Sequence, residues 1–204
     1  MTDFVSATAS YERWLASHMA VVQKDLALKH ERMSESPFVF LRATFYRWVE
    51  LFPSVCGDLT ELPHLAAVGD LHIENFGTWR DPEGRLVWGV NDLDEASTLP
   101  YVSDLVRLAT SVAFALEDGH LRIGFRDACE AIGDLPKRRD EWKLLRAMGW
   151  ETANVHLATS QVCRMVSRDL GRRNTRWLER ATVAMAEATI SDWKVWAARS
   201  RARA

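Results

Sequence analysis

Seven polar side chains suited to metal binding or phosphoryl transfer lie within 26 residues of one another. They are Asp70, His72, Glu74, Asn75, Asp92, Asp94 and Glu95. Asp70 precedes Asn75 by five residues, so one loop can present a carboxylate to a nucleophile and an amide oxygen to a metal. Oxygen donors of these two kinds hold Mg²⁺, which usually completes its shell with water and substrate phosphate. The pattern therefore predicts an acidic site for a metal ion and phosphoryl transfer.

Each of these residues also has a structural interpretation. Asp and Asn in loops mostly cap helices and form turns, and Glu74 and Glu95 taken singly are expected to be solvated surface acids. For His72 we prefer a hydrogen-bonding role that fixes the loop. Three residues taken together favour a site, because an apolar run leads directly into the loop that holds the first two, and sites often form on such loops. They are Asp70, Asn75 and Asp92.

The elements around the two acidic groups are a strand and a hairpin. Residues 64–69 form a short apolar run that ends in Gly69, which predicts a buried strand followed by a loop. Residues 76–79 and 86–90 flank Asp81-Pro82-Glu83-Gly84, whose composition is typical of a turn in a hairpin. The hairpin would deliver Asp92 and Asp94, and their alternating spacing would point both to one face of an extended strand end. Pro100 then opens a helix that reaches Val112.

Helical patterns account for most of the remaining chain. Apolar steps of three and four predict one or two helices over 3–31, and a further helix follows Ser36-Pro37 until Pro53 stops it. Helices are also expected over 137–147, 149–170 and 174–198. The fold class is mainly α with a small β element, that is α+β. We expect N-terminal helices and the hairpin region over 1–116, a joint over 117–136, and a C-terminal helical region over 137–200 that packs on the same domain.

Charge and composition argue against a nucleic-acid partner and against a membrane-spanning segment. The 204 residues carry a net charge of −2, so no overall basic field favours nucleic acid. Three separated cysteines fit a reducing compartment, and no leader or membrane-spanning run is seen, so we expect a cytoplasmic protein without a membrane partner. Seven of the nine tryptophans lie in helical patterns and are expected to be core or interface anchors. The basic end, 199–204, is expected to fray.

Longer motifs resemble known families. GDLHIENFG at 69–77 resembles the HGDxHxxN loop of aminoglycoside phosphotransferases and choline kinases, and VNDLDEA with the following Pro100 and Asp104 resembles their second acidic block. The chain is more similar to the bacterial domain-of-unknown-function family 2252, a kinase-like family. The similar segments are SPFVFLRATFYRW at 36–48, GDLHIENFG, NDLDEA at 91–96, DLVRLATS at 104–111 and MGWETANVHLAT at 148–159.

This resemblance implies a fold like the C-lobe of a protein kinase and a Mg²⁺-dependent phosphotransferase that acts on a hydroxyl of a small molecule or protein. Asp70 would be the catalytic base or orienting group. Asn75 and Asp92 would bind the metal, with Asp94 as a second carboxylate. His72 and Asp104 would support the loop, although Asp104 by itself also fits an ordinary surface acid.

The chain departs from the family pattern in one segment. Family members carry a glycine-rich stretch and a lysine-bearing strand before the MGWETANVHL segment, whereas the interval 112–147 here holds neither. Neither GxGxxG nor GxxxxGK[ST] occurs, so no cofactor-binding residues are assigned and no phosphate cradle for ATP is expected. Two alternatives therefore stay open. The chain is an inactive helical binding or scaffold module that self-associates, or a second chain completes its site.

Overall fold

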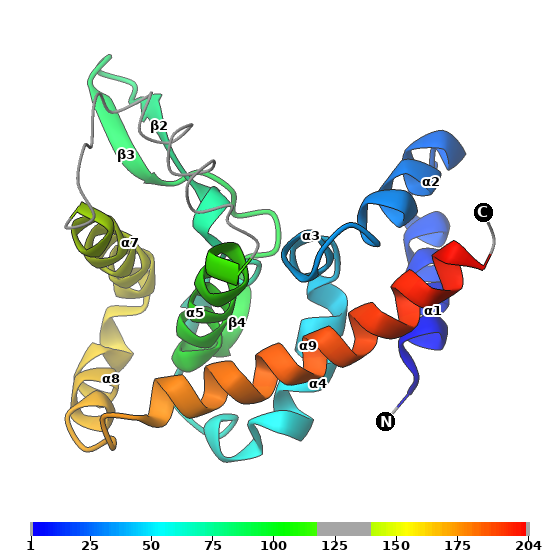
Figure 1. Cartoon of the computed structure of the whole chain (residues 1–204). Helices are drawn as coiled ribbons and strands as arrows, with labels where there is room; N and C mark the ends of the chain where they lie inside the picture. Colours follow the sequence, from blue (N-terminus) through cyan, green and yellow to red (C-terminus); the bar gives the residue numbers. More distant parts are fainter. Residues whose placement is uncertain (1, 118–139, 203–204) are drawn as a thin grey trace. The chain divides into compact units, whose positions relative to one another are not determined.

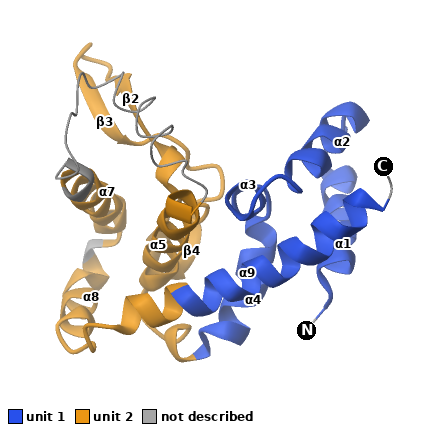
Figure 2. Cartoon of the chain, in the orientation of Figure 1, with its two compact units in different colours: residues 1–57, 183–204 blue, residues 58–182 orange. Residues whose placement is uncertain are grey.

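The computed structural model describes residues 2–117 and 140–202, with the side chains of 140–142 and 160 excepted. These residues divide into two compact units, shown in Figure 2. The first unit comprises Met1–Gly57 and Val183–Ala204, and the second comprises Asp58–Thr182. The predicted division into 1–116 and 137–200 stays a prediction, since the predicted joint lies, apart from Glu117, outside the described residues.

The first unit is helical. It contains α1 (Phe4–His18), α2 (Gln23–Arg32), α3 (Pro37–Ala43), α4 (Phe45–Val55) and the C-terminal part of α9 (Trp177–Arg201). Its core gathers Phe4, Met33, Phe40 and Trp196. The Phe4 ring lies edge-on to Trp196, with ring centroids 5.6 Å apart. The indole N–H of Trp196 donates to the carbonyl of His30 at 3.1 Å, so the last helix joins the first three around one apolar centre.

A buried ion pair also ties α4 to α9 in the first unit. The Arg47 Nε donates to the Asp192 carboxylate at 2.7 Å, and its Nη1 donates to Glu50 at 2.9 Å. Arg47 is almost fully buried. Burial acts to lower the pKa of Arg47, but its hydrogen bonds to Asp192 and Glu50 outweigh it and hold the pKa above its ordinary value. Removing either carboxylate would therefore leave this buried charge less fully compensated.

The second unit contains two small antiparallel sheets. Strand β1 (His64–Ala67) pairs with β4 (Ser97–Pro100), and β2 (Phe76–Arg80) pairs with β3 (Leu86–Val90). Residues 68–96 connect β1 to β4, and the hairpin of β2 and β3 (Figure 1) lies within this connection. The helical elements of this unit are η1 (Gly57–Leu59), η2 (Ile73–Asn75), α5 (Tyr101–Glu117), α7 (Asp140–His156), η3 (Leu157–Val162), α8 (Cys163–Leu170) and the start of α9.

The predicted fold class is confirmed, since the described residues are mainly helical with two small two-stranded sheets. The strand at 64–67 and the hairpin are also confirmed. None of the helices in the described ranges is both long and apolar enough to span a bilayer.

Several boundaries differ from the prediction. The single helix expected to end at Pro53 is two helices that meet at Thr44, whose hydroxyl donates back to the Phe40 carbonyl at 2.7 Å. Pro53 lies inside α4, which continues to Val55. The expected break before residue 149 is absent from α7. The helix ends instead at His156, because Thr159 is non-helical and its hydroxyl accepts the Ala66 N–H of β1 at 2.9 Å.

Of the tryptophans expected to be core or interface anchors, two are confirmed as core residues, and an interface role for the exposed ones stays a prediction. Trp48 and Trp196 are buried, whereas Trp14 and Trp150 are 54% and 66% exposed. The Trp14 ring stacks on the Tyr11 ring of the same helix, with ring centroids 5.8 Å apart. The expected fraying of 199–204 is also wrong for its first part, because α9 continues to Arg201.

Candidate active site

The turn that carries Asp70 is fixed by hydrogen bonds from α5. Strand β1 ends at Ala67, and Gly69 adopts a φ of 85°, which is the left-handed region that favours glycine. The Asp104 carboxylate accepts the Val68 N–H at 2.8 Å through one oxygen and the Gly69 N–H at 3.0 Å through the other. Asp104 has no exposed surface. The interpretation of Asp104 as an ordinary surface acid is therefore wrong.

A histidine from α7 reaches the same carboxylate. The His156 Nε2 lies 2.8 Å from an oxygen of Asp104, and both residues are buried. Asp104 thus has donors from two backbone groups and one ring. Because a buried carboxylate is costly unless its oxygens are hydrogen-bonded, this arrangement accounts for a charged residue at the centre of the second unit.

Asp70 itself forms an ion pair with α5. The Arg107 Nε donates to the Asp70 Oδ1 at 2.8 Å, and the Nη2 of the same guanidinium contacts the same oxygen. The Arg107 side chain is fully buried, whereas the Asp70 side chain is 21% exposed. Burial lowers the pKa of Arg107, and the Asp70 charge opposes this shift. The Asp70 carboxylate is thus held in one position while part of it faces solvent.

Two residues after Asp70, His72 caps the short 3₁₀ helix η2, which runs from Ile73 to Asn75. The Asn75 Oδ1 accepts the His72 N–H at 3.2 Å, and the His72 Nδ1 accepts the Glu74 N–H at 3.2 Å. This assigns the ring proton of neutral His72 to Nε2. The Ile73 N–H donates to the Ser111 hydroxyl of α5 at 3.2 Å. Both His72 and Asn75 are buried, so their side chains have local structural roles in the loop.

The second acidic segment, residues 91–96, is exposed throughout. The Asp92 Oδ1 accepts the Asp94 N–H at 3.2 Å, so the segment turns and is not the extended strand end that the alternating spacing assumed. The expectation that Asp92 and Asp94 point to one face of a strand is therefore wrong. Glu74 and Glu95 are both exposed, as expected of surface acids.

The hairpin register brings part of the predicted set together. Phe76 pairs with Val90, and the Asn91 N–H donates to the Asn75 carbonyl at 2.9 Å. The residue before Asp92 therefore lies directly opposite Asn75. Asp104 accepts a hydrogen bond from Gly69, the residue before Asp70. Arg107, one helical turn after Asp104 on α5, donates to Asp70 itself. Within the described ranges, no group of three or more His, Cys, Asp or Glu side chains is gathered closely enough to hold a metal ion.

A family comparison supports the resemblance carried by these motifs. A family described as "Uncharacterized protein conserved in bacteria (DUF2252)" matches residues 21–132, more than half of the chain. The chain belongs to this family. No curated protein and no solved structure matches the sequence.

Three residues that position the Asp70 turn were missed in the sequence. Arg107 and Ser111 lie in the family motif DLVRLATS, three and seven residues after Asp104, which places them on the same face of α5. That periodicity is a signal by which both could have been found. His156 lies in the similar segment MGWETANVHLAT, but nothing in that segment indicates a contact with Asp104, which lies 52 residues earlier in the chain.

Proposed function

We propose that this DUF2252 chain carries the catalytic-loop half of a Mg²⁺-dependent phosphotransferase that acts on a hydroxyl acceptor. One observation carries the proposal. The Asp70 carboxylate is held by a buried arginine on a turn that Asp104 fixes, and yet it keeps an exposed part. A carboxylate in that state can accept a hydrogen bond from a substrate hydroxyl and orient its oxygen toward a phosphoryl group. Orientation and charge stabilisation supply most of the catalysis in this reaction class.

Three side chains would supply oxygen ligands to Mg²⁺, and one of them is already hydrogen-bonded within the loop. Asp92 and Asp94 offer exposed carboxylates, and Asn75 lies opposite Asn91. The Asn75 amide oxygen already accepts the His72 N–H, and its second lone pair is the one that a metal would use. These three residues would hold the ion together with water and substrate phosphate. When bound, Mg²⁺ neutralises charge on the phosphate oxygens.

The decisive experiment measures binding and turnover on the same protein. Isothermal titration of the folded chain with MgCl₂, with ATP and with both should show Mg²⁺ binding that Asp92→Asn weakens. Phosphate release or transfer from ATP should require Mg²⁺ and should be lost in Asp70→Asn. Titrations without heat for either ligand, on protein shown to be folded by circular dichroism, would overturn the proposal.

A second function is favoured by a different observation. Leu93 is 51% exposed between the two acidic residues of the 91–96 segment, and the Asn75 side chain is used inside the loop. An inactive binding module that keeps the loop as a scaffold would present that leucine to a partner, a second copy of the chain included. A concentration-independent monomer in light scattering would count against self-association. A site completed by another chain is distinguished by activity that appears only when that chain is added.

A further inference from the structure

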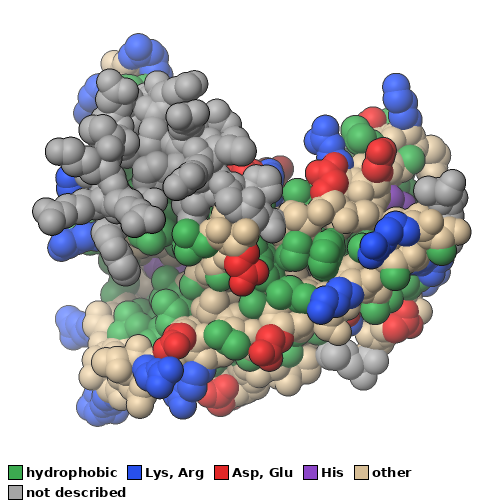
Figure 3. Space-filling view, viewed as in Figure 1, with side chains coloured by type: hydrophobic (Ala, Val, Ile, Leu, Met, Phe, Trp, Pro, Cys, Tyr) green, Lys and Arg blue, Asp and Glu red, His purple; other side chains and the backbone are tan. Residues whose placement is uncertain are grey.

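The second unit carries a concentration of positive charge that the proposed phosphotransferase site does not use. Between residues 143 and 182 the chain has eight lysine and arginine side chains and three acidic ones, although the whole chain has a net charge of −2. Figure 3 shows blue side chains along the lower left edge, over α8 and the start of α9. The sequence stretch 143–182 therefore carries an excess of positive charge.

The acidic residues of this stretch are already engaged. Asp169 accepts hydrogen bonds from the Tyr101 hydroxyl and the Arg173 Nε, each at 2.6 Å. Burial acts to raise the pKa of Asp169, but these two bonds outweigh it and hold the pKa below its ordinary value. Glu179 pairs with Arg176, and Glu151 accepts from the Asn154 amide.

Three arginines on α8 and its C-terminal turn have no such partner. Arg164, Arg168 and Arg172 follow one another at four-residue steps and are all exposed. None of the three forms an ion pair with a carboxylate in the described ranges. Because a helix turns about 100° per residue, Arg164 and Arg168 lie within about 40° of each other on α8, with Met165 beside them. Arg164 and Arg168 therefore lie on one side of α8, and Arg172 follows in the turn after the helix, where its charge acts on Asp169.

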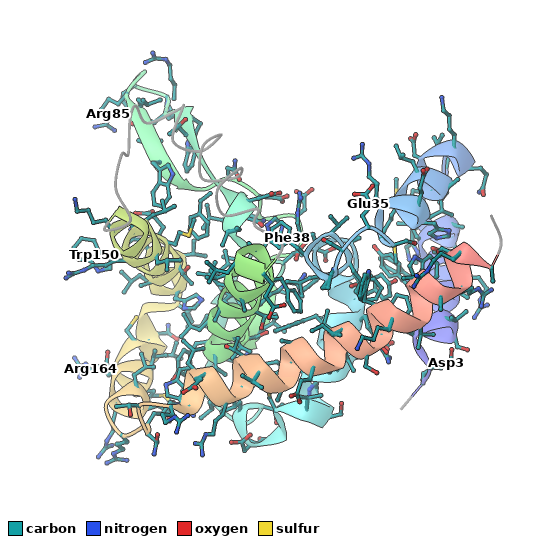
Figure 4. The ribbon with its side chains drawn as sticks, in the orientation of Figure 1. Asp3, Glu35, Phe38, Arg85, Trp150 and Arg164 are labelled. Atoms are coloured by element: carbon teal, nitrogen blue, oxygen red, sulfur yellow. The ribbon has the colours of Figure 1, made fainter. Side chains whose placement is uncertain are left out.

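Exposed apolar side chains accompany these arginines. Trp150 on α7, Leu157 on η3 and Met165 on α8 are 66%, 55% and 56% exposed. The guanidinium of Arg146 lies 5.5 Å from the centre of the Trp150 ring. In Figure 4, Trp150 and Arg164 both point outward, away from α5. We use the name arginine face for the exposed side chains that follow one another along α7, η3, α8 and the turn after it, namely Trp150, Leu157, Arg164, Met165, Arg168 and Arg172.

We infer that the arginine face docks the protein on a membrane surface containing anionic phospholipids. The two kinds of side chain match the two parts of such a surface, because guanidinium groups pair with lipid phosphates while Trp, Leu and Met enter the boundary between headgroups and acyl chains. Clusters of basic residues are attracted to anionic leaflets in this way. The expectation of no membrane partner rested on the lack of a spanning run, which surface binding does not need. The inference is independent of the proposed phosphotransferase.

Vesicle sedimentation tests this inference on the full chain. The protein should pellet with vesicles of mixed phosphatidylglycerol and phosphatidylcholine and remain in the supernatant with phosphatidylcholine alone. Raising NaCl from about 0.1 M to about 1 M, which shortens the Debye length from about 10 Å to about 3 Å, should release it. The triple variant R164Q/R168Q/R172Q should lose about tenfold or more in affinity for the mixed vesicles. L157S/M165S should weaken binding to the same vesicles while keeping every charge.

A matched control removes the same charge elsewhere. K24Q/R32Q/K194Q changes three exposed cations of the first unit and should sediment with mixed vesicles as the wild type does. Circular dichroism should show all variants to be folded. Three results would overturn the inference: no sedimentation of the wild type with mixed vesicles, an equal loss in the control, or binding only to a duplex or single-stranded oligonucleotide. The last result would make the arginine face a nucleic-acid surface.

Discussion

The two acidic segments of the second unit, the Asp70 turn and residues 91–96, are built in opposite ways. The turn is tied to α5 and α7 through Asp104, Arg107 and His156, all of them buried. The 91–96 segment is exposed, and the Asp92 side chain accepts a hydrogen bond from a backbone group two residues away. The turn therefore contributes to the stability of the unit, whereas the exposed segment can meet a ligand at little structural cost.

The largest effect is expected from Asp104→Ala. This change leaves the Val68 and Gly69 N–H groups and the His156 ring without their acceptor in a buried region. The free energy of unfolding should fall by about 3–5 kcal/mol, measured by urea denaturation. Thr110→Val, also in the buried part of α5, removes only a hydroxyl that donates to its own helix and should cost far less. Equal losses in the two variants would contradict the special role of Asp104.

The second-largest loss of stability is expected from Asp70→Asn. The substitution keeps the shape of the side chain and removes the counter-ion of a fully buried arginine, so the free energy of unfolding should fall by about 2–3 kcal/mol. The partial exposure of Asp70 makes this smaller than the Asp104 effect. Adding Arg107→Met to Asp70→Asn should restore part of the loss, because the buried charge is then gone. Strict additivity of the two single changes would show that the pair is not coupled.

The same comparison explains what sequence patterns could and could not predict. Local signals predict the loop that holds Asp70 and Asn75 and the hairpin that leads to Asp92. These signals are an apolar run that ends in glycine and a turn containing Pro82 and Gly84 between two short strands. The pairing of β1 with β4 has no such signal, since it joins residues on either side of the hairpin and depends on long-range contact. The bond from His156 to Asp104 is equally non-local.

Two predicted helix boundaries are absent from the structure. Pro53 sits inside α4, and Gly149 does not interrupt α7. Helix α7 ends instead at His156, three residues before the non-helical Thr159. The Thr159 hydroxyl accepts the Ala66 N–H of β1. The conformation at Asp92 also differs from the expectation, since the alternation of Asp92 and Asp94 predicts an extended strand end where the chain turns.

A smaller loss is expected from Gly69→Ala, which tests the backbone of the Asp70 turn. A residue with a Cβ at a φ of 85° is strained by about 1–2 kcal/mol, so the free energy of unfolding should fall by that amount. Gly84 has a φ of 80° at the exposed tip of the hairpin and provides the matched control, Gly84→Ala. Both variants should lose similar stability, and only Gly69→Ala should lower any Mg²⁺-dependent turnover. Equal turnover in the two variants would separate the turn from the proposed activity.

The smallest effect on stability is expected from Asp92→Asn. Asparagine keeps the side-chain oxygen that accepts the Asp94 N–H, and position 92 is exposed, so the free energy of unfolding should change by less than about 0.5 kcal/mol. The same substitution removes a charged metal ligand, and heat of Mg²⁺ binding should fall if the 91–96 segment holds the ion. Asp81→Asn in the hairpin turn removes an exposed pair with Arg85 and serves as a control that should leave Mg²⁺ binding unchanged. A large loss of stability in Asp92→Asn would show that the exposed segment is as structural as the turn, and the distinction between the two segments would then fail.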